Sequence, residues 1–148
     1  MVIGIIGESC TGKSTIADEL SKMVNASVFS GKDYLKLAKN EADAKRQFVN
    51  LLNLSDNNDN TIIYVITEPE HLSFLPPKAI RVLVTAELDV IKERFAKRMN
   101  GKLPPPVAAM LEKKHGMFDK EKHNLKIENI GGNTVEVCDQ IIALLCRN

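Results

Sequence analysis

The stretch "GIIGESCTGKST", from Gly4 to Thr15, decides the fold of this chain. Within it, Gly7, Gly12, Lys13 and Ser14 satisfy the pattern G-x-x-x-x-G-K-[ST]. An apolar run typical of a buried strand precedes Gly7, and apolar residues at helical spacing follow Lys13. Strand, glycine-rich loop and helix, in that order, are the context that a phosphate-binding loop requires.

The chemistry of this phosphate loop follows from its backbone. Glycines let the chain fold round an anion with its N–H groups pointing inward, and the following helix adds unpaired N–H groups and the positive end of its dipole. Lys13 is expected to supply a charge to the β- and γ-phosphates of ATP, and the Ser14 hydroxyl to bind Mg²⁺. A structural glycine turn is the plain alternative, but it leaves Lys13 unexplained. The residues expected to bind ATP here are Gly7, Glu8, Ser9, Cys10, Thr11, Gly12, Lys13, Ser14 and Thr15.

Composition limits the remaining possibilities. The 148 residues suffice for one domain with one core, so a single domain over residues 1–148 is expected. A net charge of +1 predicts no general attraction to nucleic acid or to a membrane surface. No apolar run approaches the roughly 20 residues that span a bilayer, and the N-terminus lacks the basic leader of a signal peptide.

The three cysteines, Cys10, Cys138 and Cys146, fit no metal-binding spacing, and their odd number argues against a disulfide framework. A cytoplasmic location is therefore the simplest expectation. Cys10 is either a reactive thiol or a small side chain that fits the phosphate loop. Cys138 and Cys146 are expected to be small buried side chains on a C-terminal helix.

Strand-like and helix-like segments alternate along the chain. The strand-like segments are 1–6, 27–30, 61–67, 79–86 and 124–129. The helix-like segments are 13–24, 32–52 with a break near 39–41, 87–99, 107–117, and 134–145 with Thr134 as N-cap. This alternation predicts an α/β fold, a parallel sheet with helices on both faces.

A phosphate loop alone does not separate a kinase from a GTPase or a motor ATPase. The chain is short for a motor of the AAA type. It also lacks the "NKxD" segment with which GTPases read the base, and a "DxxG" segment after the third strand. Those two classes are therefore not expected.

Three further segments resemble the small P-loop kinases, namely the nucleoside monophosphate kinases, cytidylate kinase and dephospho-CoA kinase. They are "SGKDYLK" (30–36), "IKERFAKR" (91–98) and "LKIENIGGN" (125–133). The resemblance covers nearly the whole chain. It implies a three-layer P-loop fold with a five-stranded parallel sheet in the order 2-3-1-4-5, an acceptor-binding region over 31–60 and a short lid over 98–118.

The resemblance also implies roles for individual residues. Asp33 would lie beside the phosphate acceptor, and Lys36 would take the place of a phosphate-binding arginine. Arg94 and Arg98, which share one helix face because they are four residues apart, would lie over the transferring phosphoryl group. Gly131, Gly132 and Asn133 would lie near the adenine of ATP. Plainer alternatives remain: Asp33 could be a helix-terminal carboxylate, and the two arginines could form a solvated helix face.

The segment "TEPEHLSF" (67–74) departs from the relatives. It lacks the "DGFPR" of adenylate kinases, the glycine-arginine-aspartate of cytidylate kinases and the Gly-Gly pair of shikimate and gluconate kinases. Glu68 is the candidate acidic partner of Mg²⁺, with Glu70 as a rival, and a plain loop carboxylate is the alternative. Arg46 is the only arginine between the second and third strands, so the sequence leaves the acceptor open.

The preferred hypothesis is an ATP-dependent kinase that phosphorylates a nucleotide or a related small metabolite, acting as a monomer or homodimer. The alternative from a different class is an NTP-binding regulatory or degenerate P-loop domain without transfer activity. A kinase of nucleic-acid ends is disfavoured, because the charge is near neutral and the chain has two tyrosines and no tryptophan.

Overall fold

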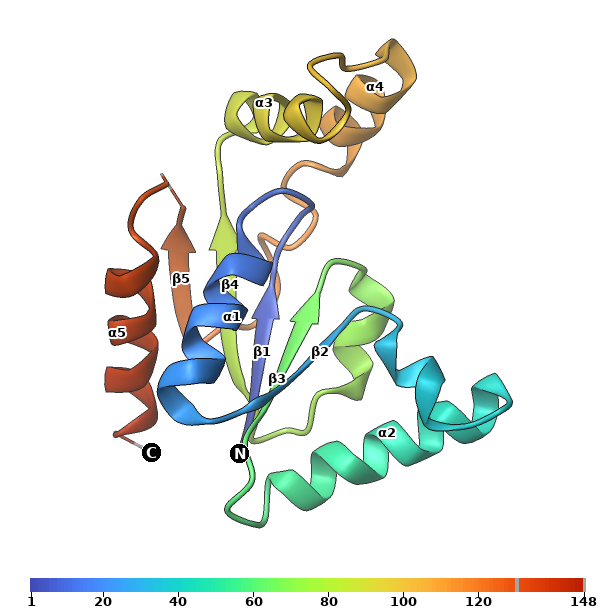
Figure 1. Ribbon diagram of the computed structural model, residues 1–148, viewed down its shortest axis with the longest axis vertical. Coiled ribbons are helices and arrows are strands. Elements are labelled where there is room, and N and C mark those ends of the chain that lie inside the picture. The colour runs from blue at the N-terminus through green and yellow to red at the C-terminus, as the bar shows by residue number, and fades with distance from the viewer. Residues whose placement is uncertain (130, 148) are drawn as a thin grey trace.

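A single parallel sheet organises the computed structural model, which describes residues 1–129 and 131–147. Its strands are β1 (Val2–Ile6), β2 (Ser27–Ser30), β3 (Ile62–Ile66), β4 (Ile80–Thr85) and β5 (Leu125–Glu128). Their order in the sheet is β2-β3-β1-β4-β5, and each neighbouring pair is parallel (Figure 1). The strand order that the sequence resemblance implied is confirmed.

Helical segments connect the strands. They are α1 (Lys13–Val24), the 3₁₀ turns η1 (Asp33–Leu37) and η2 (Pro69–Phe74), α2 (Glu41–Ser55), α3 (Leu88–Arg98), α4 (Pro105–Lys114) and α5 (Thr134–Leu145). None of the helices among the described residues has the length and apolarity needed to cross a membrane.

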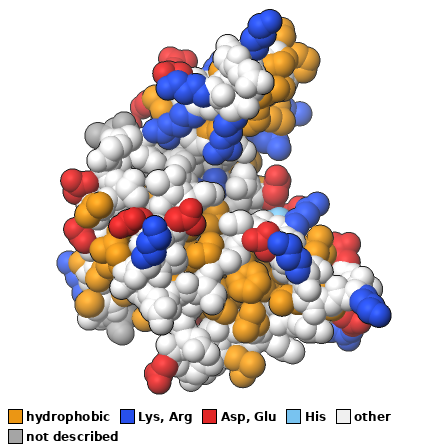
Figure 2. All heavy atoms as spheres, viewed as in Figure 1, with side chains coloured by type: hydrophobic (Ala, Val, Ile, Leu, Met, Phe, Trp, Pro, Cys, Tyr) orange, Lys and Arg blue, Asp and Glu red, His pale blue; other side chains and the backbone are white. Residues whose placement is uncertain are grey.

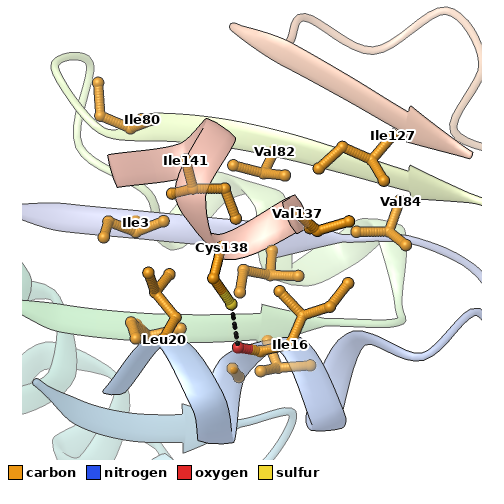
Figure 3. Packing of buried hydrophobic residues seen from close by; sticks show 14 residues of the cluster. Ile3, Ile16, Leu20, Ile80, Val82, Val84, Ile127, Val137, Cys138 and Ile141 are labelled. Carbon is orange, nitrogen blue, oxygen red and sulfur yellow. Dashed lines mark hydrogen bonds between the residues drawn. The ribbon is translucent and has the colours of Figure 1, made fainter. Parts of the chain in front are cut away.

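One face of the sheet packs against α1 and α5. Alternate strand residues such as Ile3 and Ile5 point to this side, where they meet Ile16 and Leu20 of α1 and Ile141 of α5, all at most 1% exposed. Figure 3 shows this cluster, in which the Cys138 thiol also lies 3.6 Å from the carbonyl of Ile16. All five residues of β1 are buried, because the strand lies in the middle of a sheet that is covered on both sides. This explains why β1 has apolar residues on both faces.

The other face packs against α2 and the two 3₁₀ turns. Val2 and Ile6 point to this side, together with an aromatic group in which Phe48 lies between Tyr34 and Tyr64 at centroid distances of 5.6 and 4.8 Å. Helices therefore cover both faces of the sheet, as the alternation of segments predicted.

Four details differ from the sequence expectations. The helix expected to begin at Val107 begins at Pro105, because proline is tolerated in a first helical turn, where its missing N–H has no partner to lose. Asn133, not Thr134, is the N-cap of α5. The second helix extends to Ser55, three residues beyond the expected Leu52. Of the C-terminal cysteines, Cys138 is buried as expected, whereas Cys146 is exposed.

The carboxyl ends of the strands point towards α3 and α4, which stand beyond the sheet (Figure 1). The phosphate loop leaves β1 at this edge, where the Gly7 N–H donates to the carbonyl of Ile66 at 3.1 Å. A small separate core joins α3 and α4 to the loop: Cys10 packs there with Ile91 and Leu111. We call residues 98–118 the lid segment.

The two glycines of β1 and its loop provide a matched test of this packing. A Cβ at Gly7 would lie 2.4 Å from the backbone oxygen of Val84, whereas a Cβ at Gly4 would meet only the flexible end of Leu75, at 2.8 Å. We expect Gly7→Ala to lower the free energy of unfolding by about 1–3 kcal/mol more than Gly4→Ala, because backbone cannot move aside as a side chain can. Urea denaturation of both variants measures this difference, and equal losses would contradict it.

Candidate active site

The phosphate loop holds its shape through residues in the left-handed region of backbone conformation. Gly12 has a φ of 91° and Cys10 a φ of 64°. A Cβ at Gly12 would lie 2.0 Å from Nδ2 of Asn129, so another chain segment occupies the space of a side chain. Glycine at this position is therefore required both by the φ angle and by the close approach of Asn129.

Asn129 and Arg94 brace the loop from outside. The Asn129 side chain donates from Nδ2 to the Thr11 carbonyl at 2.7 Å. The Arg94 guanidinium donates from Nη1 to the Cys10 carbonyl at 3.1 Å and from Nη2 to the Asn129 carbonyl at 3.2 Å. Three carbonyl oxygens, those of Cys10, Thr11 and Asn129, are satisfied in this way, which fixes the path of the loop backbone.

Lys13 is buried at the first turn of α1, only 5% exposed. Its ammonium donates to the Glu8 carbonyl at 2.5 Å, and that carbonyl also accepts from the Thr11 hydroxyl at 2.9 Å. Burial is the main cause that lowers the pKa of Lys13 from 10.5 to about 8; Cys10 and Glu8 act in the opposite direction, and the nearby Arg98 adds to the lowering. The structure thus places a lysine of reduced basicity inside the loop.

A small pocket of about 120 Å³ opens above this lysine; we call it the loop pocket. Its described lining consists of Ser9, Cys10, Gly12, Lys13, Ser14, Thr15, Thr67 and Arg98. Arg98 is the last residue of α3 and the first residue of the lid segment. Loop and lid residues that lie 85 positions apart in the chain therefore share one pocket.

The hinge pocket, of about 350 Å³, lies alongside. It is lined by Cys10, Gly12, Thr15, Arg94, Lys97, Arg98, Asn129, Gly131, Gly132 and Thr134. Of the three residues expected near adenine, Gly131 and Gly132 line this pocket, whereas Asn133 caps α5 and its buried Oδ1 has no partner among the described residues. Ile130, within the same expected loop, lies outside the described residues.

The structure distinguishes the two arginines that the sequence treats alike. Arg98 lines both pockets, while Arg94 lines only the hinge pocket and spends its two terminal nitrogens on backbone carbonyls. Spacing on a helix predicts a shared face but not which carbonyls lie opposite each residue. Arg94 braces the loop through its carbonyl oxygens, and Arg98 lines the loop pocket together with Lys13 and Ser14.

At the carboxyl end of β3, Thr67 and not Glu68 lines the loop pocket. Glu68 is the exposed N-cap of η2, and Glu70 is exposed as well. Side chains alternate along a strand, and Val65 already points to the α1 face, so Thr67 continues on that side. This two-residue period was a signal in the sequence that would have identified Thr67.

The acceptor-side carboxylate Asp33 lies after β2, at the same edge of the sheet. Its Oδ2 accepts the N–H of Ser30 at 2.9 Å, so part of its hydrogen-bonding capacity closes the turn into η1. Lys36 is exposed on η1. These two residues lie at the edge where the resemblance expects an acceptor, on the turn η1 that follows β2, a strand two positions from β1 in the sheet.

Glu8 makes contacts that the sequence did not predict. It is 9% exposed, its Oε1 lies 3.0 Å from Nδ1 of His115, and its Oε2 accepts the Gly116 N–H at 3.1 Å. Both partners belong to the far end of the lid segment. No motif signals this contact, because the residues are more than a hundred positions apart.

The arrangement suits a magnesium ion that arrives with a nucleotide. Within the described part of the chain, no three His, Cys, Asp or Glu side chains are grouped as a metal site. Mg²⁺ commonly binds through one or two protein oxygens plus substrate phosphates and waters. The exposed Ser14 hydroxyl, which faces the loop pocket, fits such a partial site.

The reduced basicity of Lys13 predicts a pH dependence. Only the ammonium form attracts a phosphate, and this form is lost as the pH rises through about 8. We therefore expect the affinity for ATP to be constant below this pH and to fall up to about tenfold for each pH unit above it. Isothermal titration calorimetry between pH 7.5 and 9.5 measures this.

The control for this prediction is Lys13→Ala. It should bind ATP more weakly than the native chain, with little change in affinity over the same pH range. Native affinity in Lys13→Ala would show that the loop lysine does not hold the phosphates, and an unchanged slope would assign the pH dependence to another group.

Comparison with known proteins finds solved structures with a similar fold. No family model matches the chain, and no curated protein sequence matches it. Among solved structures, an uncharacterized protein from Eubacterium ventriosum superposes with a TM-score of 0.69 at 17% identity, covering 100% of this chain and 99% of that one.

Two named kinases are also similar. The shikimate kinase from Acinetobacter baumannii, in complex with shikimate, has a TM-score of 0.67 at 15% identity, covering 99% of this chain and 93% of that one. A gluconokinase from Sinorhizobium meliloti has a TM-score of 0.63 at 12% identity, covering 99% and 91%. At these identities the likeness concerns architecture: the chain has the fold of the small P-loop kinases.

Proposed function

We propose that the protein is an ATP-dependent kinase that transfers the γ-phosphoryl group to a small molecule. The observation that carries this proposal is the loop pocket, where Arg98 from the lid segment lies with Lys13 and Ser14 from the phosphate loop. A binding loop alone would hold a nucleotide. A second cation, delivered from a separate segment, is what the transfer of a phosphoryl group additionally requires.

Each residue has a distinct part in this proposal. The loop N–H groups and Lys13 hold the β- and γ-phosphates, and Arg98 stabilises the charge that spreads over the transferring group. Ser14 would hold Mg²⁺, with Glu68 as the acidic candidate, and the metal would neutralise charge between the phosphates. Arg94 acts as a positioning residue, since its hydrogen bonds go to the loop.

The donor nucleoside is assigned to the hinge pocket. This pocket, of about 350 Å³, adjoins the loop pocket. The two pockets share the lining residues Cys10, Gly12, Thr15 and Arg98. A triphosphate that runs through the loop pocket would therefore leave its ribose and base among Gly131, Gly132 and Arg94. ATP is the proposed donor.

The acceptor is assigned to the edge formed by β2 and β3. Ligands of open α/β sheets bind beyond the carboxyl ends of the strands, and Asp33 and Thr67 lie at two of these ends. Asp33 would take the proton of an acceptor hydroxyl, and Lys36 would attract an anionic acceptor. The lid segment, attached on the other side of the loop, would exclude water and so favour transfer to the acceptor over hydrolysis.

One observation favours the second candidate, a regulatory NTP-binding domain. Of the described residues that line the loop pocket, none carries a carboxylate, and Thr67 occupies the end of β3. A metal-bound nucleotide would then be held with fewer protein ligands than phosphoryl transfer commonly uses. Such a domain would bind ATP without passing the phosphoryl group on.

A single assay separates the two candidates. The protein is incubated with Mg·ATP and panels of nucleotides, nucleosides, sugars and dephospho-CoA, and ADP is followed. ADP release that depends on one acceptor class supports the kinase. ATP binding without any acceptor effect across the panels supports the regulatory domain.

Arg98→Ala tests the central residue. Because Arg98 is proposed to act on the transition state, the variant should lower kcat by about 10²- to 10³-fold and change ATP affinity by less than about threefold. Steady-state kinetics and calorimetry measure the two quantities. Lys102→Ala, which removes an exposed lysine of the lid segment, is the matched control and should leave both unchanged. Equal losses of kcat and affinity in Arg98→Ala would make Arg98 a plain binding residue.

A further inference from the structure

The lid segment is fastened to the phosphate loop at both of its ends. Near its first end, Arg94 of α3 donates to the Cys10 carbonyl. At its far end, the Glu8 carboxylate accepts the Gly116 N–H and lies 3.0 Å from Nδ1 of His115. Two loop residues separated by one position, Glu8 and Cys10, therefore hold the two stems from which the lid segment projects.

The Glu8 contact is a specific one. Glu8 is 9% exposed, and both of its carboxylate oxygens have partners on the same two consecutive residues. A buried carboxylate is costly unless it is paired and hydrogen-bonded, and a hydrogen bond to a charged group is stronger than a neutral one. The carboxylate therefore serves the contact with the lid segment.

Glu8 also contacts the residue that would respond first to a phosphate. Its carbonyl oxygen accepts the Lys13 ammonium at 2.5 Å and the Thr11 hydroxyl at 2.9 Å. When Lys13 turns to a phosphate, this carbonyl loses its strongest partner. The peptide unit that changes partner belongs to the same residue whose side chain holds His115 and Gly116.

Other charged groups surround this contact. An open cleft of about 450 Å³ runs beside it, with Glu87 at the end of β4, Lys126 and Glu128 on β5, and Asp119 after the lid segment. Among the described residues, the hydrogen-bond partners of the Glu8 carboxylate are His115 and Gly116, and none of these four groups. The contact can therefore be removed by itself.

We propose that Glu8 is a positioning residue that couples the occupancy of the phosphate loop to the position of the lid segment. Nucleotide binding changes the hydrogen bonds of the Glu8 peptide, and the carboxylate transmits this change to His115 and Gly116. The lid segment then orders over the loop pocket with Arg98 in place. The proposal rests on the proposed function for its catalytic meaning, but the coupling itself requires only nucleotide binding.

Hydrogen–deuterium exchange of the full chain tests the coupling, with and without Mg·ADP as the probe. The variants are Glu8→Gln, His115→Gln and the double variant. Glu112→Gln is the matched control, because it removes the carboxylate of another lid ion pair, to Lys92, that does not reach the phosphate loop. The readouts are the exchange rates of amides in residues 98–118, that of Gly116 above all, and the Kd for Mg·ADP.

In the native chain, we expect Mg·ADP to slow exchange across residues 98–118. In Glu8→Gln, exchange at Gly116 should be about tenfold faster without nucleotide, because a charge-assisted hydrogen bond is lost. The slowing by Mg·ADP should disappear from the lid segment, and the Kd should rise by no more than the factor by which Mg·ADP slows lid exchange in the native chain, because the coupling is reciprocal. His115→Gln removes only the contact to Oε1 and leaves the Gly116 N–H bond to Oε2, so it should show a smaller change in the same direction. The double variant should be no worse than Glu8→Gln, which already affects both bonds. Glu112→Gln should keep the native response to nucleotide.

Several results would overturn the coupling. They are a native lid segment that does not respond to Mg·ADP, a Glu8→Gln response equal to that of Glu112→Gln, and additive effects in the double variant. A Kd that rises by more than the lost protection factor would make Glu8 a part of the phosphate site instead. If Glu8→Gln does not fold, as judged by circular dichroism, the half-exposed His115 provides the same test alone.

The outcome is separable from that of the kinase assay. Exchange coupling without acceptor-dependent ADP release would retain the positioning role and reject the kinase. Acceptor-dependent turnover with native kcat in Glu8→Gln would retain the kinase and reject the positioning role. If both proposals hold, Glu8→Gln lowers kcat, leaves the KM for ATP near its native value and raises ATP hydrolysis without acceptor.

Discussion

The close approach of chain segments around the phosphate loop is the constraint on which the rest of the structure depends. Gly7 passes the backbone of β4, and Gly12 passes the side chain of Asn129, at distances that admit no Cβ. Because the loop is wrapped this tightly, the carbonyl oxygens of Cys10 and Thr11 are satisfied from outside by Arg94 and Asn129. The sheet order follows from the same requirement, since β1 must lie between β3 and β4 for both neighbours to touch the loop.

Features that depend on neighbouring residues in the sequence were predictable. The loop motif lies within eight consecutive positions, and the alternation of strands and helices gave the parallel sheet. What sequence reasoning missed depends on contacts across the fold. Glu8 and His115 are 107 residues apart, and nothing local in either indicates the other. The difference between Arg94 and Arg98 likewise depends on where the carbonyl of Asn129 lies. Helix α4 begins at Pro105, two residues before the expected start at Val107, because proline is compatible with a first helical turn.

The net charge of the chain does not show where its charged side chains lie. The whole chain carries +1, yet lysine and arginine side chains gather over α3 and α4 beyond the carboxyl ends of the strands (Figure 2). Positive charge is thus concentrated on the segment that faces the loop and is balanced by carboxylates elsewhere. An approaching anionic ligand would experience this positive potential before it reaches the loop. The overall composition does not reveal this local potential.

The bond between the Lys13 ammonium and the Glu8 carbonyl has a consequence for how binding constants should be understood. The loop satisfies its own cation through this carbonyl, so a phosphate that binds Lys13 would replace an internal partner and would not simply add one. The measured affinity is then the difference between two complete sets of hydrogen bonds, and a loop sequence that weakens the internal set would bind more tightly without any new contact to the ligand.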